Sequence, residues 1–365
     1  MSDICIGVKK DGNNCSFKKK IGNYCGVHAP KITSVLTPSI NTNTPTPIIL
    51  NTTYNPSFPI PKILGITNIP QQFKLLQPTL TESKTNPKIF RQEVFDPPEH
   101  GPAITITFSS VVENHVGMEK IGIERGGYSV NELIEAKEKL EKLGAICEYI
   151  NLNDALIGSE YENKGEEAGV LIIRNGVDLF LEGSGLTADD MWRELNAFPW
   201  DNKYFDRRRG RVLNKHAREN VCFGDQSQIA DFEHAKGTVI AFDSVPATKI
   251  VREKLPFLFG EKSDALLAEG NRYVDVSTGG IHAHGDKCRP GVIGMRIGKN
   301  FPLHFHWFHR SNPIGLRVQL KLNNKDMYIM SSKAVGRDWR SPSKITLRHM
   351  AGAPKYLMFK PKKEK

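Results

Sequence analysis

The stretch from Asn271 to His349 most constrains the fold, because it is a series of short apolar runs separated by Gly, Pro and Asn. Such runs with turn residues between them are typical of β-strands in a sandwich or jelly roll. Val292–Gly298 is apolar and ends at a glycine, and Leu303–Phe308 is an alternating strand. We therefore expect an α+β fold whose main domain is a double-stranded β-helix, or jelly roll, with flanking helices.

Composition divides the chain into five segments. One of them holds thirteen of the 22 prolines, which do not allow helices to continue, and it is interpreted as a linker. The segments are a Cys/His unit at 1–29, the Pro/Thr/Asn-rich linker at 30–102, a small α/β domain at 103–176, the main domain at 177–356 and a basic tail at 357–365.

Several helix and strand signals lie within these segments. Ala103–Phe108 alternates Ile and Thr like a strand. A helix is predicted over 129–143, because Ser129 and Glu132 have the spacing of a capping box. A second helix is predicted after Thr187 as N-cap, and a third over Thr248–Leu255.

His284 and Asp286 form an H-x-D pair in the segment expected to be β-rich. Residues i and i+2 of a strand point to the same face, so the imidazole and the carboxylate would converge. Two histidines and one carboxylate make the facial triad of non-haem Fe(II) oxygenases, which leaves positions open on the metal. The pair supplies two thirds of that triad.

The neighbouring motifs carry a resemblance. Asn271 and Tyr273 form an N-x-Y pair upstream, a strand with a Met follows the polar turn at Asp326, and Thr346-Leu-Arg348 ends a strand. This order, over about residues 186–350, resembles the AlkB-like 2-oxoglutarate- and Fe(II)-dependent dioxygenases. It is also similar to oxygenase-like proteins of large DNA viruses, in which short N-terminal Cys/His units occur.

The resemblance implies a site for a metal and for a co-substrate. His284 and Asp286 would bind Fe(II), Asn271 and Tyr273 would contact 2-oxoglutarate, and Arg348 would pair with its far carboxylate. A planar guanidinium binds a carboxylate in a bidentate manner, which suits Arg348 to that role. The family enzymes use O2 to hydroxylate a C–H bond, and formaldehyde leaves if the carbon is an N-methyl group.

The sequence departs from the family at the second histidine. The expected place holds Trp339 and Arg340, so His349 is the candidate third ligand. His304 or His306 would serve if His349 does not. Without a third ligand, the fold would be a degenerate one that acts as a binding or virion-associated protein.

The N-terminal unit offers Cys5, Cys15, Cys25 and His28. Three thiolates and one imidazole suit a closed tetrahedral Zn(II) site. Twenty-nine residues bury too small a core to fold without a metal. The unit would bind nucleic acid or dock a protein partner, and the sequence favours neither.

The net charge of +10 suits a polyanionic partner. The leading hypothesis is an oxygenase that acts on a nucleic-acid base; the alternative substrates are a protein or a small metabolite. A basic run, the polar stretch after it and the histidines of the aromatic strand are the candidate substrate contacts. These residues are Arg208, Arg209, Arg211, Asn214, His304 and His306.

We expect no membrane segment, because no apolar run reaches the roughly 18 residues that a spanning helix needs. The N-terminus lacks the apolar stretch of a secretory signal. Both observations predict an intracellular protein, cytoplasmic or nuclear, or a virion component if the source is viral.

Overall fold

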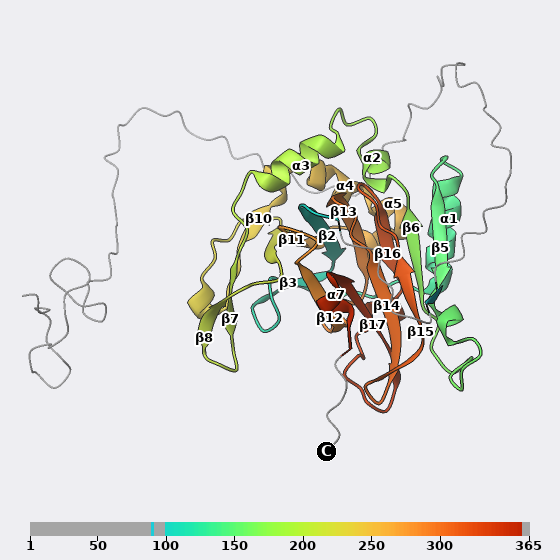
Figure 1. Cartoon of the computed structure of the whole chain (residues 1–365). Coiled ribbons are helices and arrows are strands. Elements are labelled where there is room, and N and C mark those ends of the chain that lie inside the picture. Colours follow the sequence, from blue (N-terminus) through green and yellow to red (C-terminus); the bar gives the residue numbers. More distant parts are fainter. Residues whose placement is uncertain (1–88, 91–98, 360–365) are drawn as a thin grey trace, which may run out of the picture. The chain divides into compact units, whose positions relative to one another are not determined.

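Two mainly antiparallel sheets contain most of the strands in the computed structural model, which describes residues 89–90 and 99–359 (Figure 1). The larger sheet has the order β10 (Val239–Ala241), β9 (Glu219–Gly224), β11 (Leu267–Tyr273), β2 (Ala103–Ser109), β13 (Val292–Gly298), β16 (Met327–Met330), β6 (Gly169–Ile173), β5 (Cys147–Asn151). The smaller sheet has the order β1 (Ile89–Phe90), β15 (Asn312–Leu320), β14 (Leu303–His309), β17 (Ile345–Gly352), β12 (Gly280–His284). The fold is thus mixed, with strands predominating.

The helices are short and most of them pack on one face of the larger sheet. They are α1 (Val130–Glu141), α2 (Gly176–Leu181), α3 (Ala188–Asn196), α4 (Pro246–Lys254), α5 (Pro256–Phe259), α6 (Ser332–Val335) and α7 (Pro354–Leu357). Helices α1 to α5 bury their apolar residues in one cluster with that sheet. The expected capping box of α1 is confirmed, because Ser129 accepts from the Glu132 N–H while Glu132 accepts from Ser129. Thr187 caps α3 in the same way with Asp190.

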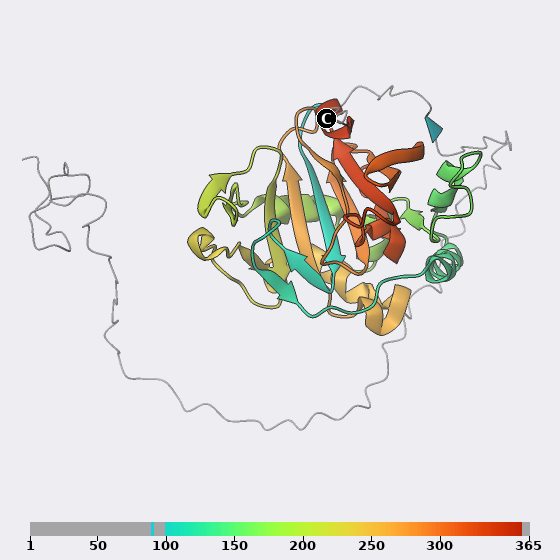
Figure 2. The same cartoon turned by 90° about the horizontal axis from the view of Figure 1, so that it is seen from below.

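Strand β2 lies in the middle of the larger sheet, between β11 and β13, and Figure 2 shows it in blue-green between orange strands. Strands β5 and β6 end the same sheet. The predicted segments 103–176 and 177–356 therefore share one sheet and one core, and the described residues fall within one compact unit. This corrects the expected boundary at residue 176, because backbone pairing over more than a hundred residues joins the two segments.

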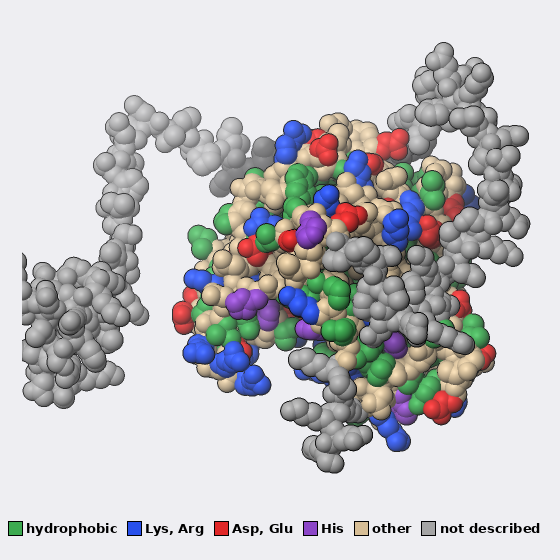
Figure 3. Space-filling view, viewed as in Figure 1, with side chains coloured by type: hydrophobic (Ala, Val, Ile, Leu, Met, Phe, Trp, Pro, Cys, Tyr) green, Lys and Arg blue, Asp and Glu red, His purple; other side chains and the backbone are tan. Residues whose placement is uncertain are grey.

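Two hairpins project from the sheets. One pairs β3 (Val111–Glu113) with β4 (Lys120–Gly122), and the other pairs β7 (Lys203–Asp206) with β8 (Arg211–Asn214). Figure 3 shows Lys and Arg side chains gathered at the end of the β7–β8 hairpin, at the lower left of the view.

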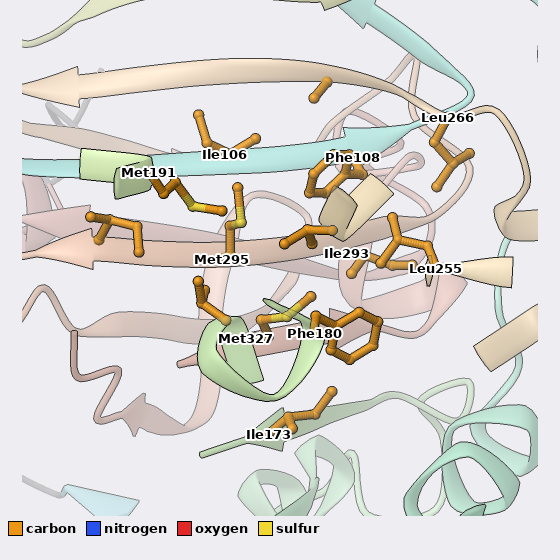
Figure 4. Packing of buried hydrophobic residues seen from close by; sticks show 14 of the residues in the cluster. Ile106, Phe108, Ile173, Phe180, Met191, Leu255, Leu266, Ile293, Met295 and Met327 are labelled. Atoms are coloured by element: carbon orange, nitrogen blue, oxygen red, sulfur yellow. The ribbon is translucent and has the colours of Figure 1, made fainter. Parts of the chain in front are cut away.

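Side chains of β2 point alternately to the two faces of the larger sheet, and each face borders a different part of the interior. Ile104, Ile106 and Phe108 pack against the helices, and Figure 4 shows Ile106 near Met191 of α3 and Phe108 near Ile293. The threonines between them face the smaller sheet and line a cavity there. A second apolar cluster, which includes Trp307, contains residues of both sheets.

Several expectations lie outside the described residues. They are the zinc ligands Cys5, Cys15, Cys25 and His28, nearly all of the linker and most of the tail. Among the described helices, none combines the length and the apolar character that crossing a bilayer requires.

Candidate metal centre

Strands β12 and β17 bring the three predicted iron ligands together. His284 is the cross-strand partner of His349, and their ring centroids are 4.4 Å apart. Asp286 follows the end of β12, with Oδ1 3.6 Å from His284 Nε2 and Oδ2 3.8 Å from His349 Nε2. One ligand atom from each residue lies within 4.8 Å of the other two. The predicted convergence is thus present, while the identity of the bound ion stays a prediction.

The protonation of this cluster suits a cation. Nδ1 of His284 lies 2.8 Å from the carbonyl oxygen of His282 and 3.1 Å from that of His349. Carbonyl oxygens only accept hydrogen bonds, so Nδ1 donates and the proton is on that nitrogen. The Nε2 lone pair of a neutral ring then faces Asp286 and can bind a metal.

Burial shifts the pKa values in the same direction. It lowers the pKa of His284 to about 4, helped by the charge of Arg218, and it lowers that of His349 well below the ordinary value. Both imidazoles are therefore neutral near pH 7. Burial raises the pKa of Asp286 to about 7, which Arg218 partly opposes. A divalent metal beside this buried carboxylate would favour its charged form.

The cluster opens into a cavity of about 840 Å³ between the two sheets. Its wall on the larger sheet is polar, unlike the surrounding core. The polar residues of this wall are Thr105, Thr107, Glu269, Asn271, Tyr273, Arg296 and Tyr328, and the apolar Val292 and Met330 lie beside them. Such polar groups inside a fold are normally hydrogen-bonded, so a polar cavity wall indicates a ligand site.

Asn271 and Tyr273, the predicted co-substrate contacts, both line this cavity. The Asn271 amide is held firmly, since Oδ1 accepts from Arg218 Nε at 2.6 Å and from Asn220 Nδ2 at 2.7 Å. Its Nδ2 donates to Glu269 Oε1 at 3.1 Å. These bonds fix which face of the amide is presented to the cavity.

Arg348 does not line the cavity, which corrects its predicted role. Adjacent residues of a strand point to opposite faces, so Arg348 points away from the side on which His349 lies. Its guanidinium lies 4.0 Å from the Phe308 ring centroid, and Nη2 donates to the Trp339 carbonyl at 3.2 Å. It supports the loop behind the sheet instead.

The histidines predicted to contact substrate lie on that same outer face. His306 is the cross-strand partner of Arg348, and His304 is the partner of Met350. Phe305 between them faces His349 and the inner core. Neither His304 nor His306 lines the cavity, so they are not alternative metal ligands either.

The basic run lies beside the cavity. Arg208, Arg209, Arg211 and Asn214 are part of the β7–β8 hairpin or its turn and do not line the cavity wall, whereas the neighbouring Arg207 does. A hydrogen bond from Arg207 Nε to the Gly117 carbonyl joins this hairpin to the β3–β4 turn.

Arg296 and Arg289, which both line the cavity, were not singled out by the sequence analysis. Arg296 on β13 is 2% exposed, and its Nε and Nη1 have no hydrogen-bond partner among the described residues. Arg218 lies close enough to lower the pKa of His284 and of Asp286. A signal for Arg296 was present, because it is the one charged residue of an otherwise apolar strand.

Comparison with known proteins gives a relative but no described family. No family model matches the chain. Over 255 residues the chain is 40% identical to an uncharacterized protein of Acanthamoeba polyphaga mimivirus, a match that covers 70% of this chain and 97% of the viral protein. The chain therefore belongs to the same family as this mimivirus protein.

Proposed function

We propose that residues 99–359 form an Fe(II)- and 2-oxoglutarate-dependent oxygenase that hydroxylates or demethylates a nucleic-acid base. The observation that carries the proposal is the convergence of two neutral imidazoles and one carboxylate at a polar cavity. That donor set fits Fe(II) and leaves positions on the ion for further ligands. His284, Asp286 and His349 would hold the ion.

The path of the chain supports a jelly roll as the scaffold. Strands alternate between the sheets, with β11, β13 and β16 in the larger one and β12, β14, β15 and β17 in the smaller one. A jelly roll is wound from two such sheets. In our proposal β2 completes the roll by occupying the position between β11 and β13.

Arg296 is proposed to bind the far carboxylate of 2-oxoglutarate, the role that the sequence assigned to Arg348. A buried guanidinium with unpartnered nitrogens is costly, and a carboxylate would satisfy it through two parallel hydrogen bonds. Tyr273 is near enough to Arg296 and Arg218 that both cations act on its pKa, so it lies in the region of both. In this proposal Arg296 and Arg218 would each pair with one carboxylate of the dicarboxylate.

When bound, Fe(II) and 2-oxoglutarate supply the chemistry that couples O2 to oxidation of a C–H bond. The residues of the chain have simpler tasks. The histidines and Asp286 would fix the ion, and Arg296 and Asn271 would orient the co-substrate. The apolar side chains of Val292, Leu303 and Met330 in the cavity wall would help to exclude water.

The β7–β8 hairpin supports a nucleic-acid substrate. Its arginines lie beside the cavity, and cations of this kind neutralise phosphates. His115 stacks on Tyr204 with ring centroids 3.9 Å apart, and His115 also lines the cavity. Burial lowers the pKa of His115 to about 4, so this pair is an uncharged aromatic surface on which a base can stack.

Succinate release in the presence of Fe(II), 2-oxoglutarate and O2 tests the proposal. The wild-type protein should release succinate, and Asp286→Ala should abolish the release because a two-histidine site holds the ion poorly. Asp243→Ala is the matched control, since that side chain is 79% exposed. Turnover that persists in Asp286→Ala would refute the mechanism.

A further inference from the structure

A buried ion pair holds the Asp286 carboxylate from behind. Arg289 follows Asp286 by three residues, and its Nη1 lies 3.2 Å from Asp286 Oδ2. Its Nη2 is in contact with Glu269 Oε2, and Nη1 lies 3.4 Å from Thr107 Oγ1. One guanidinium thus connects the predicted metal ligand to strands β11 and β2 of the larger sheet.

The pair is nearly inaccessible to water. Arg289 is 7% exposed and Glu269 is 5% exposed. Burying two charges costs about as much as their attraction returns, and an apolar pair of similar size is often at least as stable. Stability therefore gives little reason for this pair, whereas its position directly behind Asp286 suggests a reason in the geometry of that carboxylate.

The two carboxylate oxygens of Asp286 have different contacts. Oδ2 accepts from Arg289, while Oδ1 is 3.6 Å from His284 Nε2 and accepts no hydrogen bond within the described part of the chain. A rigid guanidinium that is itself anchored at its other nitrogen cannot follow a rotating carboxylate. Asp286 is therefore restrained with Oδ1 directed toward His284 and with Oδ2, the oxygen that Arg289 holds, 3.8 Å from His349 Nε2.

We infer that Arg289, anchored by Glu269, is a positioning residue that fixes Asp286 for metal binding. The inference rests on the metal site of the proposed function. It adds that the affinity of this site depends on two charged residues that do not touch the ion. Glu269 also accepts from Asn271 Nδ2, so the same pair connects the metal ligand to a proposed co-substrate contact.

Co(II) binding, followed by visible absorption without 2-oxoglutarate or O2, tests the inference apart from turnover. Arg289→Lys keeps the charge but loses the fork that spans Asp286 and Glu269. We expect the affinity for Co(II) to fall about 10- to 100-fold, as is usual when the partner of a metal ligand is lost, and the absorption band to shift. Glu269→Gln keeps an acceptor for Asn271 but releases Arg289, and should give a smaller change in the same direction.

Arg252→Lys is the matched control, because Arg252 is 8% exposed, about as buried as Arg289, and does not line the cavity. Its Co(II) affinity and spectrum should equal those of the wild type. Circular dichroism checks that each variant is folded. If Arg289→Lys is unfolded, the Co(II) affinity and spectrum of Glu269→Gln test the inference.

The outcomes separate the inference from the proposed function. Wild-type binding no tighter than that of Asp286→Ala refutes the metal site, and the inference with it. Clear wild-type binding, together with an unchanged affinity and spectrum in the folded Arg289→Lys or Glu269→Gln variant, overturns the inference alone.

Discussion

Replacing Arg296 with methionine should have opposite effects on the ligand-free and the ligand-bound protein. The Arg296 guanidinium is buried, burial lowers its pKa, and two of its nitrogens have no partner among the described residues. A buried charge without a partner destabilises a fold. Ligand-free Arg296→Met should therefore melt at or above the temperature of the wild type, whereas most changes in a core lower it.

The loss of affinity follows from the bonds that the carboxylate would make. A guanidinium gives a carboxylate two charge-assisted hydrogen bonds, each contributing about 1.5–3 kcal/mol. Losing both costs about 3–6 kcal/mol, which corresponds to a more than about 100-fold weaker affinity. Arg296→Lys keeps the charge and one bond, so an affinity about 10- to 100-fold weaker is expected.

Titration calorimetry and thermal shift with 2-oxoglutarate, in Mn(II)-loaded protein without O2, measure both quantities. Glutarate, which has the carboxylates but no keto group, tests the arginine apart from the metal. Arg348→Met is the matched control on the outer face of the smaller sheet, and it should bind 2-oxoglutarate like the wild type. Normal affinity in Arg296→Met, or a large loss in Arg348→Met, would refute the assignment.

Three further predictions concern the zinc unit, the metal site and the hairpin. The full chain should contain one zinc beyond the metal of the cavity, and Cys15→Ser/Cys25→Ser should lose it by elemental analysis; retained zinc would refute the assignment. Metal affinity should fall about tenfold per pH unit below about pH 7, because one proton competes for Asp286 while both histidines stay neutral. A steeper fall, measured by Co(II) titration across pH 5.5–8.5, would show that histidine protons take part. Replacing the hairpin arginines with alanine should weaken the binding of single-stranded oligonucleotides and reduce its salt dependence, and equal slopes in the variant and the wild type would exclude the hairpin as a phosphate contact. The arginines meant are Arg208, Arg209 and Arg211.

Local patterns predicted the local structure well. The capping box at Ser129 and the N-cap at Thr187 are confirmed, and the alternation of Ile and Thr after Ala103 does form a strand. Each of these features depends on residues close together in the sequence. The H-x-D spacing also predicted that His284 and Asp286 lie near one another, and they do, although β12 ends at His284 and Asp286 lies just beyond the strand.

The prediction of site residues was weaker wherever it depended on which face of a strand points into the cavity. Arg348 and His349 were both assigned to one cavity, although neighbours on a strand face opposite ways. His304 and His306 were predicted to line the cavity, because both faces of this strand carry aromatic residues and the sequence does not show which face is inside. Arg296 was overlooked, although a charged residue in an apolar strand is rarely buried without a partner.

The residues near β2 in the sequence also do not show which strands pair with it. Thr107 Oγ1 donates to the Glu269 carbonyl across 162 residues of sequence, so the pairing depends on distant parts of the chain.

The central position of β2 affects how the protein folds during synthesis and where the chain can be truncated. Its hydrogen-bonding edges stay unpaired during synthesis until β11 and β13 have left the ribosome, and exposed strand edges invite pairing with other chains. The cavity is likewise closed by the first long strand and by one of the last, so neither half of the described region contains it alone. A clone that begins after Ser109 would lack the middle of the larger sheet, even though it retained every proposed metal ligand.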